Sequence, residues 1–134
     1  EIALSEARAI KERTGLEVEL FIHGSMCMSY SGNCVISNFT SGRDSNRGGC
    51  AHSCRFEYSL ELVDGRKEGS TFFMSSKDLN GLELLPLCTE YGIDSLKIEG
   101  RMKGPLYVAT MCKVYREALD NVGDLSNWKK QRSG

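Results

Sequence analysis

Four cysteines between residues 27 and 54 are the side chains of this 134-residue chain whose type and spacing best suit metal chemistry. They follow the pattern Cys27-x6-Cys34-x15-Cys50-x3-Cys54. Four thiolates form the ligand set of structural Zn²⁺ sites and of [4Fe–4S] clusters. The pattern lacks the paired Cys-x-x-Cys knuckles of zinc ribbons, and apolar residues around the sulfurs suit a shielded cluster. Zinc, a cluster and no metal all remain open on the spacing alone.

Cys88 and Cys112 stand apart from these four, within helical patterns, and are interpreted as buried free thiols that act as small hydrophobes. Six cysteines in 134 residues are also fewer than the roughly 8–10% typical of small disulfide scaffolds.

Basic residues accompany the cysteines. Residues 23–55 hold three arginines and one aspartate, a local charge of +2, whereas the whole chain has a net charge of −1. A guanidinium binds phosphate or carboxylate through paired hydrogen bonds. The anion-binding residues predicted for an RNA backbone or a small anionic or aromatic substrate are Arg43, Arg47, Arg101 and Lys103. Glu99 is expected to orient Arg101.

The elements that must position these residues alternate between helix and strand. Helical periodicity over residues 2–13 ends at Gly15, and apolar strands are predicted at 17–23 and 95–99. A Gly-rich, aperiodic cysteine-rich loop spans residues 24–55, and a β-hairpin follows at 56–63 and 69–74. Helices are predicted at 79–91, with a break at Pro86, and at 105–122. The pattern predicts an α/β domain over residues 1–122 and a frayed polar tail over residues 123–134.

The cysteine at position 27 follows one predicted strand, and Arg101 follows the other. If these strands are parallel neighbours, their carboxyl ends meet at one edge of the sheet, so the residues that follow each strand lie on the same side. We therefore expect one positive rim near the sulfurs, formed by Arg43, Arg47, Arg101 and Lys103. Outer strand edges without partners would favour homodimerisation.

Composition narrows the class of protein. Hydrophobic residues make up 40% of the chain and charged residues 26%, as in soluble globular domains. No apolar run approaches the roughly 20 residues of a membrane span, and the charged N-terminus is unlike a signal peptide, so a cytoplasmic location without membrane contact is expected. The chain starts in a helix without an initiator Met, which indicates a piece of a longer protein.

Four segments closely resemble the peptidase U32 family, the collagenase-like proteases. They are residues 19–37 (ELFIHGSMCMSYSGNCVIS), 42–55 (GRDSNRGGCAHSCR), 74–79 (MSSKDL) and 97–103 (KIEGRMK). The resemblance covers about residues 17–120. It implies the C-terminal segment of a (β/α)₈ TIM-barrel-like domain, with an iron–sulfur cluster on Cys27, Cys34, Cys50 and Cys54. A complete barrel needs about 250 residues, so this chain would supply only its later strands.

The resemblance leaves two kinds of enzyme open. Some members are named peptidases, and others are similar to oxygen-independent hydroxylases of RNA pyrimidines or of a quinone ring. The chain has no Gly-x-Ser-x-Gly elbow and no His-Glu-x-x-His motif, which weakens the peptidase hypothesis. We therefore expect cluster-dependent hydroxylation of RNA or another aromatic ring by the full-length protein, with a true peptidase, a zinc-stabilised module and an inactive fragment as alternatives.

Overall fold

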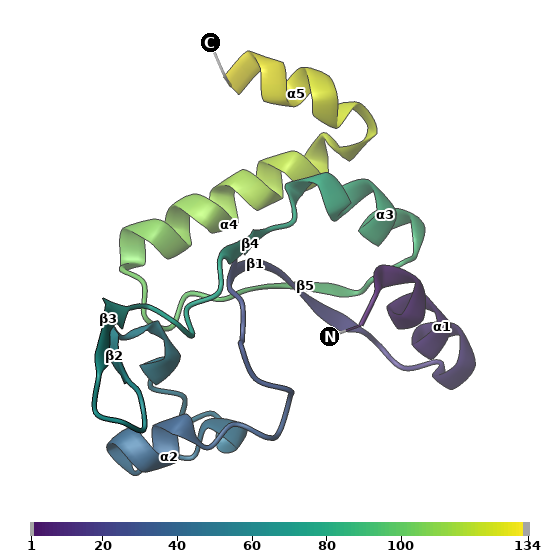
Figure 1. Ribbon diagram of the computed structural model, residues 1–134. Helices are drawn as coiled ribbons and strands as arrows, with labels where there is room; N and C mark the ends of the chain where they lie inside the picture. Colours follow the sequence, from purple (N-terminus) through teal and green to yellow (C-terminus); the bar gives the residue numbers. More distant parts are fainter. Residues whose placement is uncertain (1, 133–134) are drawn as a thin grey trace. The chain divides into compact units, whose positions relative to one another are not determined.

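The computed structural model describes residues 2–132, which divide into two compact units (Figure 1). The first, here called the sheet unit, consists of Ile2–Ser25 together with residues 78–132. The second, the cysteine unit, is Met26–Lys77 and contains all four clustered cysteines.

A three-stranded sheet organises the sheet unit. Strand β1 (Glu19–Ser25) lies in the middle, parallel to β5 (Ser95–Ile98) and antiparallel to β4 (Asp78–Asn80). The expected parallel pairing of the two strands is therefore confirmed. The third strand corrects two expectations. Residues 79 and 80, the start of the helix predicted over 79–91, belong to a strand, and the carboxyl end of β1 has a partner on its second edge. Dimerisation through the outer edge of β5 stays a prediction.

Helices pack against this sheet around one hydrophobic core. Helix α3 (Leu85–Glu90) and helix α4 (Pro105–Asp120) lie beside the sheet (Figure 1). Both helices contribute buried residues to a core that includes Ile22 of β1. The core residues are Ile22, Leu85, Cys88, Tyr115, Ala118 and Leu125. Each of these elements packs its apolar side into this core, and the shared burial holds α3, α4 and β1 together.

Helix α1 (Leu4–Thr14) ends where the sequence predicts, at Gly15 in the left-handed conformation with φ 69°. An ion pair anchors the helix, since Lys11 Nζ lies 2.5 Å from Asp94 Oδ2. The same carboxylate accepts a hydrogen bond from the backbone N–H of Val18 at 2.8 Å. Asp94 thereby ties α1 to the starts of β1 and β5.

Two further expectations need correction. The predicted tail is helical over α5 (Leu125–Arg132), after a 3₁₀ turn η4 (Val122–Asp124), because Leu125 packs into the core; residues 133–134 lie outside the described residues. Cys88 is buried in α3 as predicted, but Cys112 is exposed on α4. Pro86 stands near the start of α3, where its missing N–H is tolerated, after the 3₁₀ turn η3 (Leu82–Leu84).

The cysteine unit has more regular structure than its aperiodic sequence predicts. It contains helix α2 (Ile36–Ser41) and two 3₁₀ turns, η1 (Ser45–Arg47) and η2 (Ser53–Arg55). Strands β2 (Tyr58–Glu61) and β3 (Lys67–Thr71) then form the predicted hairpin. The expectation of a long loop without secondary structure over residues 24–55 is therefore wrong.

Parallel pairing of β1 with β5, joined through helical segments, confirms the α/β class. The assignment to a TIM-barrel segment stays a prediction. Among the residues described here, no helix combines the length and apolarity needed to span a bilayer.

Candidate functional site

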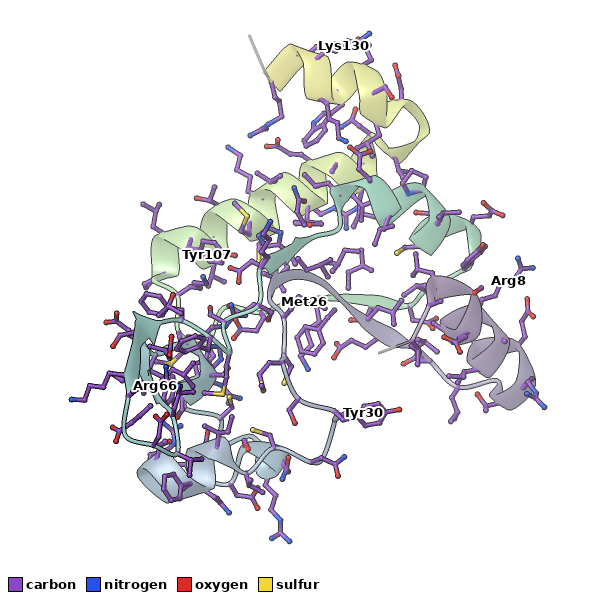
Figure 2. All side chains as sticks on the ribbon, viewed as in Figure 1. Arg8, Met26, Tyr30, Arg66, Tyr107 and Lys130 are labelled. Carbon is purple, nitrogen blue, oxygen red and sulfur yellow. The ribbon has the colours of Figure 1, made fainter. Side chains whose placement is uncertain are left out.

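Three of the four clustered cysteines face one cavity in the cysteine unit. Cys27, Cys34 and Cys50 line this cavity, whose volume is about 210 Å³. The other lining residues are Tyr30, Ser31, Gly32, Ser45 and Asn46. Tyr30 extends from the loop after β1 (Figure 2). The fold thus brings together thiols that are up to 23 positions apart in the sequence.

The fourth cysteine, Cys54, lies near the same group, although it does not line the cavity. Burial raises the pKa of the Cys54 thiol, and the negative charges of Cys50, Cys27 and Cys34 raise it further, while Arg55 acts in the opposite direction. Cys54 therefore lies within electrostatic reach of the other three thiols. Their role as metal ligands stays a prediction.

Backbone N–H groups donate to the sulfurs of two of the three cavity-lining cysteines, Cys27 and Cys50. The N–H of Ser29 donates to Cys27 Sγ at 3.4 Å, and the N–H of His52 donates to Cys50 Sγ at 3.4 Å. At Cys34 the Ser45 hydroxyl and the N–H groups of Ile36 and Ser37 act together and lower the pKa of the thiol. At Cys27 and Cys50 the donor is the N–H two residues after the cysteine, an arrangement that favours thiolate sulfur.

The turn between Cys50 and Cys54 depends on an unusual backbone conformation. His52 adopts φ 55°, and it is the one non-glycine residue with positive φ in the described range 2–132. Histidine is among the residues that tolerate this left-handed conformation. The conformation directs the His52 N–H back toward Cys50 and starts η2, which carries Cys54.

Helix α2 supports this turn through buried hydroxyl groups. Ser37 Oγ accepts a hydrogen bond from the N–H of Ala51 at 3.1 Å, and Thr40 Oγ1 lies 2.6 Å from Ser53 Oγ. Both serines are only 2% exposed. The segments that carry Cys34 and Cys50 are therefore fastened to each other independently of any metal.

Cys34 is also held by residues that sequence reasoning missed. The Asn46 side chain bonds both backbone groups of Cys34, accepting from its N–H at 3.2 Å and donating to its carbonyl at 3.0 Å. The Ser45 hydroxyl donates to the same carbonyl at 2.9 Å. Asn46 itself is fixed by Asp44, whose carboxylate accepts the Asn46 N–H at 3.0 Å. Ser45 and Asn46, which lie between the two arginines Arg43 and Arg47, thus hold Cys34 in position.

Arg55 is a second residue whose structural role the sequence pattern does not predict. Its guanidinium donates to the carbonyl of Met26 at 2.7 Å, to Ser75 Oγ at 3.1 Å and to the carbonyl of Ser76. Ser76 Oγ donates to the Met26 carbonyl as well, at 2.8 Å. These bonds fix the residue before Cys27 to the C-terminal end of the cysteine unit.

The four predicted anion-binding residues fall in different units. Arg43 and Arg47 are exposed in the cysteine unit, where Arg47 stays 88% exposed despite an ion pair of 3.5 Å with Asp44. Lys103 belongs to the sheet unit and pairs with Asp78 at 3.1 Å. Glu99 Oε1 accepts the backbone N–H of Arg101 at 2.9 Å, so it orients this residue through the main chain. The expected single rim stays a prediction.

Across residues 2–132, no three His, Cys, Asp or Glu side chains approach one another closely enough to hold a single metal ion. The donor set nevertheless suits a group that bonds thiolates, because four cysteines lie in one unit and two of them accept N–H bonds at sulfur.

Comparison with known proteins gives one matching family model, described as peptidase family U32, over residues 1–132. The "tRNA hydroxylation protein P1" of Bacillus subtilis (strain 168) is 51% identical over 90% of this chain and 30% of its own length. The "23S rRNA 5-hydroxycytidine C2501 synthase" of Escherichia coli (strain K12) is 38% identical over 99% of this chain and 21% of its own length.

Another relative bears a different name. The "Collagenase" of Porphyromonas gingivalis (strain ATCC BAA-308 / W83) is 37% identical over 78% of this chain and 26% of its own length. The chain thus spans less than a third of each of these three relatives. No solved structure matches it.

Proposed function

The chain belongs to peptidase family U32, and from this premise we propose that the full-length protein hydroxylates a pyrimidine of RNA with the help of a [4Fe–4S] cluster. The cluster's ligands are Cys27, Cys34, Cys50 and Cys54. The observation that carries the proposal is that three of these thiols, Cys27, Cys34 and Cys50, line one cavity, with N–H groups donating to the sulfurs of Cys27 and Cys50. The names of the relatives, two of which refer to hydroxylation of tRNA or rRNA, supply the substrate class.

Hydroxylation of a pyrimidine replaces a ring C–H bond by a C–OH bond. The ring carbon loses two electrons, so an oxygen-donating co-substrate must be reduced by two electrons in the same reaction. An iron–sulfur cluster, when bound, supplies one-electron transfer. The chain's own contribution is to hold the four sulfurs, through Asn46 and Ser45 at Cys34 and through α2 at the turn that follows Cys50.

The exposed arginines of the cysteine unit supply attraction for RNA. Arg43 and Arg47 carry positive charge in the same unit as the thiols, and phosphate contacts from Arg position an RNA without reading its sequence. The barrel assignment completes the proposal. Strands β1 and β5 would be two of the parallel strands of a (β/α)₈ barrel, whose reactive groups gather at the carboxyl ends of its strands.

One preparation tests the metal and the reaction together. The full-length protein is purified without oxygen and analysed for iron, acid-labile sulfide and zinc, and tRNA and rRNA from cells with and without its gene are digested to nucleosides for mass spectrometry. We expect iron and sulfide in equal amounts, about four of each per chain, and a pyrimidine nucleoside heavier by one oxygen that disappears with the gene. Zinc in place of iron, or an unchanged nucleoside profile, would contradict the proposal.

The peptidase alternative has a separate readout. The relative named collagenase is the observation that favours it. The same anaerobic preparation is incubated with denatured collagen, and release of new amino termini is measured. Cleavage that survives Cys27→Ser, in a protein that changes no nucleoside, would support hydrolysis instead.

A further inference from the structure

A second group of polar side chains lies in the sheet unit, near the carboxyl ends of β1 and β5. Its centre is His23, a half-buried residue close to the end of β1. Its neighbours are Asp78, Lys103, Tyr107 and Tyr115. Tyr107 stands in the first turn of α4 (Figure 2).

Tyr115 is the hydrogen-bond partner of His23 Nδ1, at 3.1 Å. The phenol is 4% exposed, and its oxygen has one proton to donate and two lone pairs to accept with. The N–H of Gly81 donates to Tyr115 Oη at 3.1 Å, which uses one lone pair. Two oxygens can accept the phenol's proton. They are the Ile22 carbonyl oxygen at 3.2 Å, which also accepts the Gly81 N–H at 2.9 Å, and the Asn80 side-chain oxygen at 3.4 Å.

The remaining lone pair of Tyr115 faces His23 Nδ1 at 3.1 Å. When the phenol donates its only proton to the Ile22 carbonyl, Nδ1 is the donor in the bond to His23, and this tautomer is part of the proposal stated below. A neutral imidazole with its proton on Nδ1 has an unprotonated Nε2, which is a hydrogen-bond acceptor.

Nε2 of His23 is available to a ligand. It is not a buried atom, and within residues 2–132 no group forms a hydrogen bond with it. Burial of the ring lowers the pKa of His23 from 6.5, and Lys103 lowers it too, while Asp78 raises it. The imidazole is therefore neutral at pH 7.

The surroundings of His23 suit a flat ring. The Tyr107 ring centroid lies 6.0 Å from that of His23, tilted by 35°. Lys103 Nζ lies 5.3 Å from the Tyr107 centroid and pairs with Asp78 at 3.1 Å, so the aromatic pair is bordered by an ion pair. Planar apolar surface beside a single directed acceptor is the chemistry that recognises a base bearing an N–H group.

We propose that His23 binds the substrate by accepting, through Nε2, a hydrogen bond from an N–H group of a nucleobase. Tyr115 is the positioning residue that keeps the Nδ1–H form in place. This inference rests on the proposed function and adds to it the atom that contacts the base.

The test uses the full-length protein, purified without oxygen, and tRNA from cells that lack its gene. His23→Asn places an amide near the position of Nδ1, which can keep the bond to Tyr115, but removes Nε2. Loss of one hydrogen bond should weaken tRNA binding or raise KM about fivefold to tenfold, with iron content unchanged. Tyr115→Phe should also raise KM, although Nε2 is retained, and Tyr91→Phe is the matched control on another element of the same unit.

Nitrogen-15 NMR of histidine-labelled protein gives a readout that a merely structural role would not move. At pH 7 we expect His23 to be neutral with protonated Nδ1, a pattern lost in Tyr115→Phe, and the Nε2 resonance to shift when tRNA binds. A protonated Nε2 overturns the inference, and so does a His23→Asn variant that binds and hydroxylates like wild type. A wild-type protein that neither binds nor modifies tRNA or rRNA overturns the proposed function as well.

Discussion

Asn46 and Cys34 are joined by two hydrogen bonds between one side-chain amide and both backbone groups of the cysteine, at 3.2 and 3.0 Å. The amide thus satisfies the N–H and the carbonyl of Cys34 together, as a neighbouring strand would in a sheet, although twelve positions separate the two residues. It fixes the direction of the Cys34 side chain before any metal arrives. The strength of metal binding should therefore depend on Asn46.

Asn46→Ala removes both bonds and should weaken the hold on Cys34 by roughly 1–3 kcal/mol, because each net hydrogen bond contributes about 0.5–1.5 kcal/mol. We expect the full-length variant to assemble a cluster but to lose iron to a chelator about ten times faster than wild type. The exposed Asn38 of α2 supplies the control, as Asn38→Ala. Equal rates of iron loss in both variants would refute a positioning role for Asn46.

Cys27→Ser should abolish stable cluster binding, because a hydroxyl is a poor substitute for a thiolate ligand. Iron per chain and hydrogen exchange over Met26–Lys77 are the two measurements. Since metal binding and local folding are coupled, exchange in this unit should become faster. Cys112→Ser, which alters an exposed thiol on α4, should change neither quantity. Full iron content in Cys27→Ser would remove Cys27 from the ligand set.

Asp94 makes the sheet unit sensitive to acid. The Lys11 ammonium and the Val18 N–H hold the pKa of this carboxyl below its ordinary value of 3.8. A carboxylate with a lowered pKa in the folded state stabilises that state above the pKa of the unfolded chain, and the contribution is lost as the pH falls through the folded pKa. The denaturant midpoint of wild type should thus fall more steeply than that of Asp94→Asn between about pH 5 and pH 2. Parallel curves for the two proteins would contradict the assignment, and Asp64→Asn controls for the loss of one carboxylate.

Gly24 allows the carboxyl ends of β1 and β5 to approach closely. Its φ is 107°, and a Cβ atom there would lie 2.4 Å from the Glu99 carbonyl oxygen. Gly24→Ala should lower the free energy of unfolding by about 2–4 kcal/mol, through the backbone conformation and the steric overlap together. Gly104→Ala, where no atom lies within 4 Å of the added Cβ, should be nearly neutral. Thermal unfolding of both variants tests this difference. Similar melting temperatures for Gly24→Ala and Gly104→Ala would contradict the prediction.

Arg43 and Arg47 should contribute to RNA affinity through phosphate contacts. If each neutralises one phosphate, the double change to Ala reduces the slope of log affinity against log salt by about 1.4–1.8. Titration of full-length protein with tRNA at several salt concentrations measures this slope. The control is a double variant with the same change in charge, Arg8→Ala with Arg66→Ala, which should keep the wild-type slope. An unchanged slope in the Arg43→Ala, Arg47→Ala variant would show that these two arginines make no phosphate contacts.

The sequence indicates the long periodic elements well, because α1, β1, β5 and α4 each carry enough apolar residues to define one face. Strand β4 was missed since its residues 78–80 are too few to show alternation, and their pairing with β1 is set by contacts distant in sequence. Helix α2 was missed for a similar reason, as its sequence ISNFTS has weak helix propensity. In the site, cysteine spacing identifies the thiols, whereas Asn46 and Arg55 act through hydrogen bonds to distant backbone groups that no local pattern announces.

The cysteine unit leaves the sheet after Ser25 and returns at Asp78, and these two residues are direct register partners in the antiparallel pair of β1 and β4. Topologically, the whole of Met26–Lys77 is thus the loop of a β-hairpin. A module in such a loop could be inserted, enlarged or exchanged during evolution without changing the order of the strands. The reason is that the chain leaves and re-enters the sheet at the same place, where Ser25 is paired with Asp78. A tight two-residue turn joining Ser25 to Asp78 would yield a protein that keeps the β4–β1–β5 sheet, and the module could in turn be transplanted onto another hairpin.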